Sequence, residues 1–313
     1  MMREALIWMS RSQAMGRMMT TNPIAWSAAS RFVAGETIEE AIDVVRRLAG
    51  MGLMSTLDYL GENVTDEDEA VRSCDAYLNT IDHIRSSDVE SWISLKLTAL
   101  GFDISDELTE GLLRRIIEHA ADGDPAIFVR IDMEGSPYTQ RTLDMFYKVF
   151  EDYSNVGIVI QSYLYRSDDD VETLVGKGAG VRLCKGAYSE PPSIAYPDKK
   201  DADEAYRRLT ARLLSDEARA NGTYLGVATH DEAIIEWTKG HAADNGIGPD
   251  EYEFQMLNGV RRDLQRKLVA DGYRMRVYVP YGTHWYPYFM RRLAERPENI
   301  MFMARNMVRE IGK

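Results

Sequence analysis

The chain has 313 residues, of which 45% are hydrophobic and 28% charged, a balance typical of a globular protein with a sizeable core. Its 37 Lys and Arg against 50 Asp and Glu give a formal net charge of -13, and no basic stripe of the kind that binds nucleic acid is present. This composition excludes a wholly disordered, collagen-like or coiled-coil protein, and it predicts no nucleic-acid partner.

The cysteines and the apolar runs indicate the compartment. Cys74 and Cys184 lie far apart and form no Cys-x-x-Cys pair, so we expect neither a disulfide framework nor a structural zinc site. The apolar run from Ala5 to Met9 is too short for a signal-peptide core, and no stretch approaches the roughly 20 apolar residues of a membrane span. We therefore expect a cytoplasmic protein whose contact with the inner face of the cell membrane is at most peripheral. No His-Glu-x-x-His pair occurs, so no metal site is expected.

The first part of the chain is predicted to be helical. One helix begins at Asn22-Pro23 and runs towards Phe32, and a second begins after Glu36-Thr37 and closes at Gly50. We expect residues 1–50 to form an N-terminal helical segment and residues 51–313 to form a catalytic domain.

From residue 51 on, short apolar runs alternate with longer amphipathic stretches. The eight candidate strands are Leu53–Leu57, Trp92–Leu97, Ala126–Ile131, Val156–Gln161, Gly180–Cys184, Tyr224–Ala228, Glu253–Leu257 and Met275–Val279. The stretches long enough for crossover helices include Asp66–Arg85, Asp106–Ala121, Gln140–Tyr153, Ala202–Asn221, Glu232–Asp244 and Arg261–Asp271. Eight such units predict an α/β fold, a (βα)8 barrel of the TIM type. A doubly wound open sheet is the main alternative, but Leu57–Asn63 lacks the glycine-rich turn that usually follows its first strand.

Charged residues fall on one face of several candidate strands. Ser94 and Lys96 share a phase opposite to Ile93 and Leu95, and Arg182 opposes its aliphatic neighbours in the same way. Barrel enzymes build their sites at the C-terminal ends of the strands. These residues therefore predict either a catalytic site or structural ion pairs inside the barrel.

Lys96 and Asp132 are the first candidates for chemistry. A lysine flanked by leucines is expensive to bury without a partner, and Asp132 is the counter-charge that the sequence suggests. The segment Arg182–Tyr188 places two cations and a glycine after the fifth strand, where they could hold a phosphate or an electron-rich ring. His230 ends the sixth strand and could donate a hydrogen bond to a cofactor, or simply precede a helix.

The densest patch of candidates follows the last strand, between Tyr278 and Glu295. If Trp285–Glu295 is helical, Glu295 lies four residues from Arg291 and three from Arg292, and can orient both. Two guanidinium groups suit the capture of a carboxylate or a phosphate. An ordinary surface salt bridge is the alternative interpretation.

Four blocks of the chain, in the right order, resemble the proline dehydrogenase family. They are Ser94–Thr98, Arg130–Glu134, Arg182-Leu-Cys-Lys-Gly-Ala-Tyr188, and Tyr278-Val-Pro-Tyr-Gly282 followed by Arg291-Arg-Leu-Ala-Glu295. The resemblance covers Leu57 to Glu295, and the chain is too short to add the aldehyde dehydrogenase half of the fused bacterial enzymes. It implies a distorted (βα)8 barrel with FAD over the C-terminal strand ends and the last helix over the barrel mouth.

The resemblance also implies an activity, partners and residue roles. The expected reaction is oxidation of L-proline to 1-pyrroline-5-carboxylate by hydride transfer to flavin N5, the first step of proline catabolism to glutamate. A membrane quinone would accept the electrons, and a separate pyrroline-5-carboxylate dehydrogenase would use the product. Asp132, Arg182 and Tyr278 would be catalytic. The substrate would contact Lys96, Tyr278, Tyr288, Arg291, Arg292 and Glu295, and the cofactor Met133, Gln161, Arg182, Lys185, Gly186, Ala187, Thr229 and His230.

Two other functions are compatible with the same residues. A lyase or aldolase could use Lys96 as a Schiff base on a phosphorylated or carboxylated substrate. A binding protein without catalytic activity could use the two arginines to hold small carboxylates. A yellow, flavin-containing preparation would separate the first expectation from both.

Overall fold

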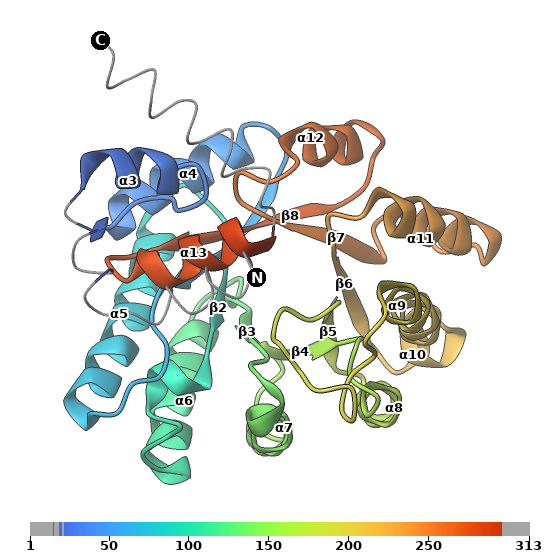
Figure 1. The fold of residues 1–313 in the computed structure, drawn as a ribbon, viewed down its shortest axis with the longest axis horizontal. Coiled ribbons are helices and arrows are strands. Elements are labelled where there is room, and N and C mark those ends of the chain that lie inside the picture. Colours follow the sequence, from blue (N-terminus) through green and yellow to red (C-terminus); the bar gives the residue numbers. More distant parts are fainter. Residues whose placement is uncertain (1–14, 16–18, 21, 296–313) are drawn as a thin grey trace.

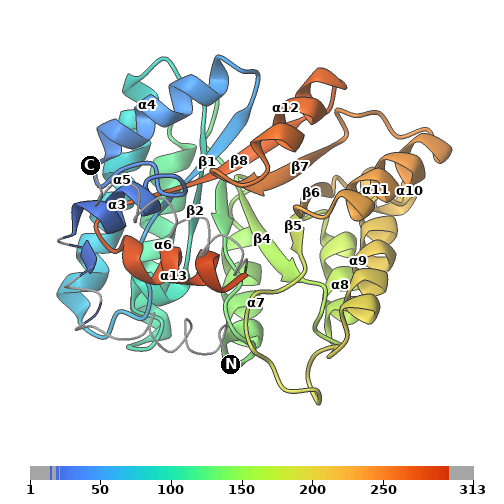
Figure 2. The same ribbon diagram turned by 45° about the horizontal axis from the view of Figure 1, so that its top comes forward.

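A computed structural model of the protein describes residues 15, 19, 20 and 22–295. Eight parallel strands form a closed barrel in which each strand pairs with its neighbours in chain order and β8 returns to β1 (Figures 1 and 2). The strands are β1 (Met54–Tyr59), β2 (Trp92–Leu95), β3 (Val129–Ile131), β4 (Val156–Gln161), β5 (Gly180–Cys184), β6 (Tyr224–Ala228), β7 (Tyr252–Leu257) and β8 (Met275–Tyr281). The prediction of a TIM-type (βα)8 barrel is confirmed.

Helices surround the barrel and cross over between successive strands (Figure 1). They are α5 (Glu67–Ser86), the short 3-10 helix η1 (Leu97–Leu100), α6 (Asp106–Ala121), α7 (Ser136–Phe150), α8 (Ser167–Lys177), α9 (Lys199–Leu213), α10 (Asp216–Ala220), α11 (Glu232–Asp244), α12 (Arg262–Ala270) and α13 (Trp285–Glu295). The single helix predicted for 202–221 is two helices, because the Ser215 hydroxyl accepts a hydrogen bond from the Ala218 amide at 3.2 Å and caps a new start.

Two helices precede the barrel. α4 (Ile38–Ala49) begins with a capping box formed by Thr37 and Glu40, and its apolar face packs against β1 and β8. α3 (Pro23–Ala29) instead contacts α13, and Trp26 lies 5.4 Å from Trp285 between ring centroids. The division of the chain at residue 50 stays a prediction.

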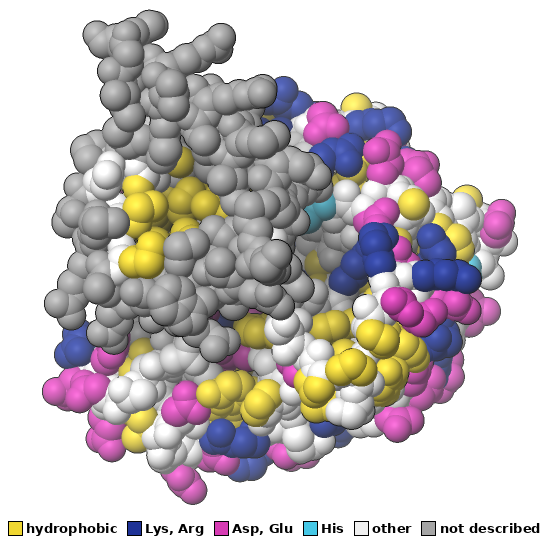
Figure 3. All heavy atoms as spheres, viewed as in Figure 1, with side chains coloured by type: hydrophobic (Ala, Val, Ile, Leu, Met, Phe, Trp, Pro, Cys, Tyr) yellow, Lys and Arg dark blue, Asp and Glu magenta, His cyan; other side chains and the backbone are white. Residues whose placement is uncertain are grey.

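α13 lies across the mouth of the barrel, where the resemblance had placed the last helix (Figure 1). Tyr288, Arg291 and Arg292 of this helix line the same cavity as residues from the C-terminal ends of the strands. Figure 3 shows hydrophobic side chains gathered on part of this face. Tyr165, shortly before α8, is 41% exposed, and Ile194 is 37% exposed.

Inside the barrel, closer to the N-terminal ends of the strands than the cavity, lies a second set of charged side chains, which we call the lower level of barrel charges: Arg130, Glu253 and Arg276. Arg276 forms an ion pair with Glu253, with 2.7 Å between Nε and Oε1, and its guanidinium lies 3.4 Å from the Trp92 ring centroid. Arg130 donates to the carbonyl oxygens of Ile158 and Gly180. The sequence analysis considered ion pairs inside the barrel, and Arg276–Glu253 is one such pair.

Glycine in β4 makes room for one of these cations. A Cβ on Gly157 would lie 2.7 Å from Nη1 of Arg130 and 2.6 Å from the Gly180 carbonyl oxygen.

Both cysteines are free thiols, as predicted. No helix among the described residues is long and apolar enough to cross a membrane.

Candidate active site

A cavity of about 770 Å³ opens at the C-terminal ends of the strands beneath α13. Its lining includes every residue that the sequence analysis assigned to the site except Glu295: Lys96, Asp132, Met133, Gln161, Arg182, Lys185, Gly186, Ala187, Thr229, His230, Tyr278, Tyr288, Arg291 and Arg292. Glu295 ends α13, and its side chain lies outside the described part of the structure. With Gln255 and Met256 of β7, residues from seven of the eight strands or the loops after them therefore converge on one cavity.

Asp132, directly after β3, is the centre of a hydrogen-bond network. One carboxylate oxygen accepts from Nη1 of Arg182 at 2.7 Å, and the other accepts from the Tyr278 hydroxyl at 2.7 Å. Arg182 also donates to Gln255 and, at 3.1 Å, to Ser94. Residues from five strands or the loops directly after them, β2, β3, β5, β7 and β8, thereby hold one guanidinium and one phenol in fixed positions at the base of the cavity.

Lys96 has a different counter-ion from the one the sequence suggested. Its ammonium lies 3.5 Å from the carboxylate of Asp58, which is fully buried at the end of β1, while Asp132 is engaged by Arg182. Burial raises the pKa of Asp58 to about 6, in spite of Lys96, and the Asp132 charge adds to the rise. Burial disfavours the Lys96 ammonium, but the carboxylates of Asp58, Glu62 and Asp132 outweigh it and raise the pKa of Lys96. Lys96 is therefore held as a cation.

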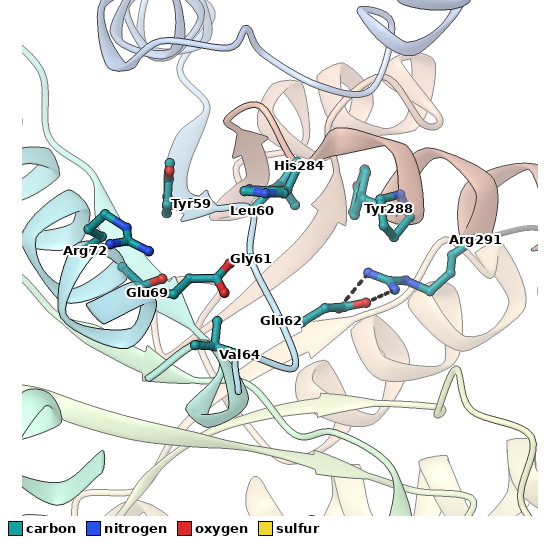
Figure 4. Close-up of a pocket in the computed structure, with 12 residues that line it drawn as sticks. Tyr59, Leu60, Gly61, Glu62, Val64, Glu69, Arg72, His284, Tyr288 and Arg291 are labelled. Carbon is teal, nitrogen blue, oxygen red and sulfur yellow. Dashed lines mark hydrogen bonds and ion pairs between the residues drawn. The ribbon is translucent and has the colours of Figure 1, made fainter. Parts of the chain in front are cut away.

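Arg291 also has a partner that the sequence analysis missed. Its guanidinium forms a two-point ion pair with Glu62, in the loop after β1, with 3.0 Å between Nη2 and Oε2 (Figure 4). Burial of Glu62 acts in the opposite direction, but Arg291 and Lys96 lower the pKa of its carboxyl. Glu62 therefore holds both terminal nitrogens of Arg291. The expected contribution of Glu295 to orienting the two arginines stays a prediction.

Glu62 and Arg291 line a second, smaller cavity of about 380 Å³ (Figure 4). Tyr288 and Arg291 line both cavities. On the same helix, the guanidinium of Arg292 lies 5.1 Å from the Tyr288 ring centroid. Both arginines therefore reach the cavity, as their positions on the helix predicted.

The loop after β5 brings backbone and cations to the other side of the cavity. Lys185 is held by Asp231 at 2.7 Å and by Asp203 at 2.5 Å. Gly186 has a φ of 122°, and a Cβ there would lie 2.1 Å from the Tyr163 ring. Only glycine therefore fits this turn, and its backbone is open to a ligand that approaches closely.

The remaining predicted contacts lie on β4 and after β6. Gln161 is buried, its Nε2 donates to the Glu134 carbonyl, and its Oε1 has no hydrogen-bond partner in the structure. The Nε2 of His230 accepts from the Leu257 amide at 3.1 Å, which fixes the ring orientation. The Thr229 hydroxyl accepts from the Asp231 amide at 3.1 Å.

Asp58, Glu62 and Gln255 are the functional residues that sequence reasoning missed. Asp58 carried a usable signal, because it is an acid within an apolar strand in the same phase as Thr56. Glu62 carried no such signal, since a glutamate in a loop five residues before the next helix is typical of a solvent-exposed side chain. Gln255 shares the interior phase of β7 with Glu253, so the alternation of that strand could have indicated it.

A closed parallel barrel whose strand ends converge on cations, tyrosines and carboxylates defines the class of the protein, a (βα)8-barrel enzyme. The chain belongs to the proline dehydrogenase family, whose model, described as "Proline dehydrogenase", matches residues 41–305.

Relatives support this membership along most of the chain. It is 43% identical to proline dehydrogenase 1 of Bacillus subtilis subsp. natto over 283 residues, covering 90% of this chain and 91% of that protein. It is 42% identical to proline dehydrogenase of Deinococcus radiodurans over 290 residues, covering 91% of each.

Among solved structures, the chain is similar to proline utilization A (PutA) from Bdellovibrio bacteriovorus, a crystal structure of the enzyme inactivated by N-propargylglycine. The TM-score is 0.79 and the identity 26%, over 86% of this chain. The match spans about a third of that longer protein, 32% of its chain.

Proposed function

We propose that this protein is a FAD-dependent proline dehydrogenase that oxidises L-proline to 1-pyrroline-5-carboxylate. Electrons pass to a membrane quinone, and a separate pyrroline-5-carboxylate dehydrogenase takes the product, in the first step of proline catabolism. Family membership supports the reaction. The observation that carries the assignment of the site is the convergence of Arg291, Arg292 and Lys96 on one cavity with two tyrosines.

The cationic side of the cavity suits the substrate carboxylate. Arg291 and Arg292 come from α13 above, and Lys96 comes from the end of β2 below. Guanidinium groups bind carboxylates through paired hydrogen bonds, which fix orientation as well as position. In this proposal the substrate carboxylate competes with Glu62 for the nitrogens of Arg291. Tyr278 and Tyr288 bound the space for the ring.

The opposite side of the cavity fits FAD. The unpartnered, buried Oε1 of Gln161 requires an N–H donor from a ligand, which a flavin ring supplies. The open backbone at Gly186 and Ala187 and the Lys185 ammonium suit a close, negatively charged group. Met133, Thr229 and His230 complete this side. FAD, when bound, supplies the two-electron acceptor for the reaction.

The protein's own part in the reaction is orientation and electrostatics. The Asp132 network locks Arg182 and Tyr278, so that neither moves as charge changes in the cavity. Fixing substrate and acceptor in contact removes the entropy of bringing them together. The substrate amine also loses a proton, and solvent at the open mouth can take it.

The lyase alternative is disfavoured by the state of Lys96. A Schiff-base lysine must be neutral to attack a carbonyl, which requires a lowered pKa. The carboxylates around Lys96 raise its pKa instead.

The test is purification followed by a visible spectrum and anaerobic addition of L-proline. We expect flavin bands that bleach with L-proline, and dye reduction with L-proline in preference to L-alanine and hydroxyproline. A colourless protein that FAD does not reconstitute would contradict the proposal.

A further inference from the structure

Four exposed arginines from different segments come close enough that the other three act on the charge of Arg262, and we call them the arginine seam. Arg262 and Arg266 are on α12, Arg47 is on α4, and Arg31 precedes α4. α4 and α12 both pack against β8, on the same side of the barrel (Figures 1 and 2). Arg262 donates through Nη2 to the backbone oxygen of Arg31 at 3.4 Å. Arg262 and Arg266 are four residues apart on α12 and share one helix face.

The seam differs from most of the other exposed arginines that the structure describes in having no acidic partner. Within the described part of the chain, no carboxylate forms an ion pair with any of its four guanidinium groups. By contrast, Arg46 on the other flank of α4 pairs with Asp43 and Asp88, and Arg208 pairs with Asp168. The nearest acids on the same helices, Asp43 and Asp263, pair with other arginines, Arg46 and Arg261.

The like charges disfavour one another. Partial burial, and then the charges of Arg31, Arg266 and Arg47, lower the pKa of Arg262. A like-charge pair spaced four residues apart also destabilises a helix. An anion bound along the seam would relieve this repulsion, so the seam favours binding of negatively charged groups.

An exposed apolar side chain lies at the far end of the seam. Met51 follows the end of α4 and is 41% exposed, one of four large hydrophobic side chains with such exposure in the described chain. The next residue, Gly52, packs against Val269 of α12, since a Cβ on Gly52 would lie 3.0 Å from its Cγ1. Met51 therefore borders both helices of the seam.

We propose that the arginine seam docks the enzyme on the anionic phospholipid surface of a membrane, with Met51 at its edge. Guanidinium groups bind phosphate through paired hydrogen bonds, and basic residues near an anionic leaflet attract it additively. Docking by this surface rests on the proposed function, in which the electron acceptor is a membrane quinone. It brings an otherwise acidic enzyme to its acceptor and holds it in one orientation.

The experiment compares vesicle binding by two matched triple variants of the flavin-loaded enzyme. The seam variant changes Arg31, Arg47 and Arg266 to Gln, and keeps Arg262 because it donates to backbone. The control variant changes Arg46, Arg115 and Arg208 to Gln, which alters net charge equally but removes only exposed ion pairs. Co-sedimentation is measured with vesicles of phosphatidylcholine alone and with added phosphatidylglycerol, at low and high salt.

Wild type should bind the phosphatidylglycerol vesicles more tightly than the neutral ones, and salt should weaken this binding. Each seam arginine contributes roughly fivefold, so the seam variant should bind about a hundredfold more weakly. The control variant should stay within about fivefold of wild type.

Three results would overturn the docking surface: equal binding to both kinds of vesicle, equal loss in both variants, or capture of a soluble acidic polypeptide without vesicle binding. Dye reduction by the soluble enzyme with L-proline should be the same in both variants. If the wild-type enzyme shows no dye reduction with L-proline, the proposed function is refuted, while vesicle binding remains an independent measurement of the docking surface.

Discussion

The guanidinium of Arg291 is engaged at both terminal nitrogens by the carboxylate of Glu62. This pair joins the loop after β1 to the helix over the barrel mouth, two segments 229 residues apart in the chain. The proposed substrate carries the same chemical group as Glu62. The carboxylate of Glu62 therefore marks where a ligand carboxylate can bind Arg291.

We expect Arg291→Met to raise the KM for L-proline by about ten- to a hundredfold, because one charge-assisted interaction is worth roughly 1.5–3 kcal/mol. The kcat should fall as well, since the arginine also orients the substrate. The ratio of flavin to protein absorbance should stay at the wild-type value. Loss of FAD instead would make Arg291 a cofactor ligand. A wild-type KM would place the carboxylate site elsewhere.

The double variant Glu62→Gln/Arg291→Met separates stability from binding. Arg291→Met alone leaves a largely buried carboxylate without its cation, which lowers the free energy of unfolding. Neutralising Glu62 as well should recover most of the lost melting temperature while the KM stays high. If the melting temperature of the double variant falls further, the pair does not act as a unit in the folded protein.

Asp58 should give the activity a dependence on pH. Its pKa is raised to about 6, so its carboxyl becomes neutral as the pH falls through 6 and Lys96 then loses its nearest counter-charge. We expect kcat/KM to decrease below about pH 6 in wild type. In Asp58→Asn that decrease should be absent, and kcat/KM should be lower by about tenfold at all pH values, as for a lost charge-assisted interaction. Asp88→Asn, which removes an exposed carboxylate, should keep the wild-type profile. A persistent acid limb in Asp58→Asn would assign it to another group.

The fold was predictable because its signals are local. Val156–Gln161, Gly180–Cys184 and Tyr224–Ala228 have the predicted bounds, since each is a short, mainly apolar run flanked by turns. The third strand is shorter than Ala126–Ile131 and begins at Val129, because β3 pairs with β4 only from that residue.

The membership of the cavity was also predictable, but the ion-pair partners were not. Strand phase and the resemblance placed Lys96 and Arg291 in the cavity. Which acid meets each cation depends on how strands and loops close in space, and neither Asp58 nor Glu62 is close in sequence to its partner. Asp132 was assigned to Lys96 because strand phase does not reveal that Arg182 and Tyr278 both engage its carboxylate.

Gly186→Ala should deplete the cofactor. The φ of 122° and the Tyr163 ring leave no room for a methyl group, so the loop after β5 must move away from the cavity wall. We expect a lower ratio of flavin to protein absorbance, with the circular dichroism of the barrel unchanged. Gly240→Ala in α11 is the matched control, because a Cβ there meets no atom within 4 Å. Equal flavin content in the two variants would mean that this loop does not hold FAD.

The lower level of barrel charges should affect stability much more than the site, although Gln255 links the two by donating to Glu253 and accepting from Arg182. Arg276 and Glu253 are 5% and 1% exposed, and removing one partner of such a pair costs about 3–5 kcal/mol, because the other charge stays buried alone. Arg276→Met should therefore lower the melting temperature strongly, while the folded fraction keeps the wild-type KM for L-proline. Arg276→Met/Glu253→Leu removes both charges and should recover part of the loss. Chemical denaturation and steady-state dye reduction measure the two effects separately. A raised KM with unchanged stability would show that the link through Gln255 makes the Arg276–Glu253 pair part of the substrate site.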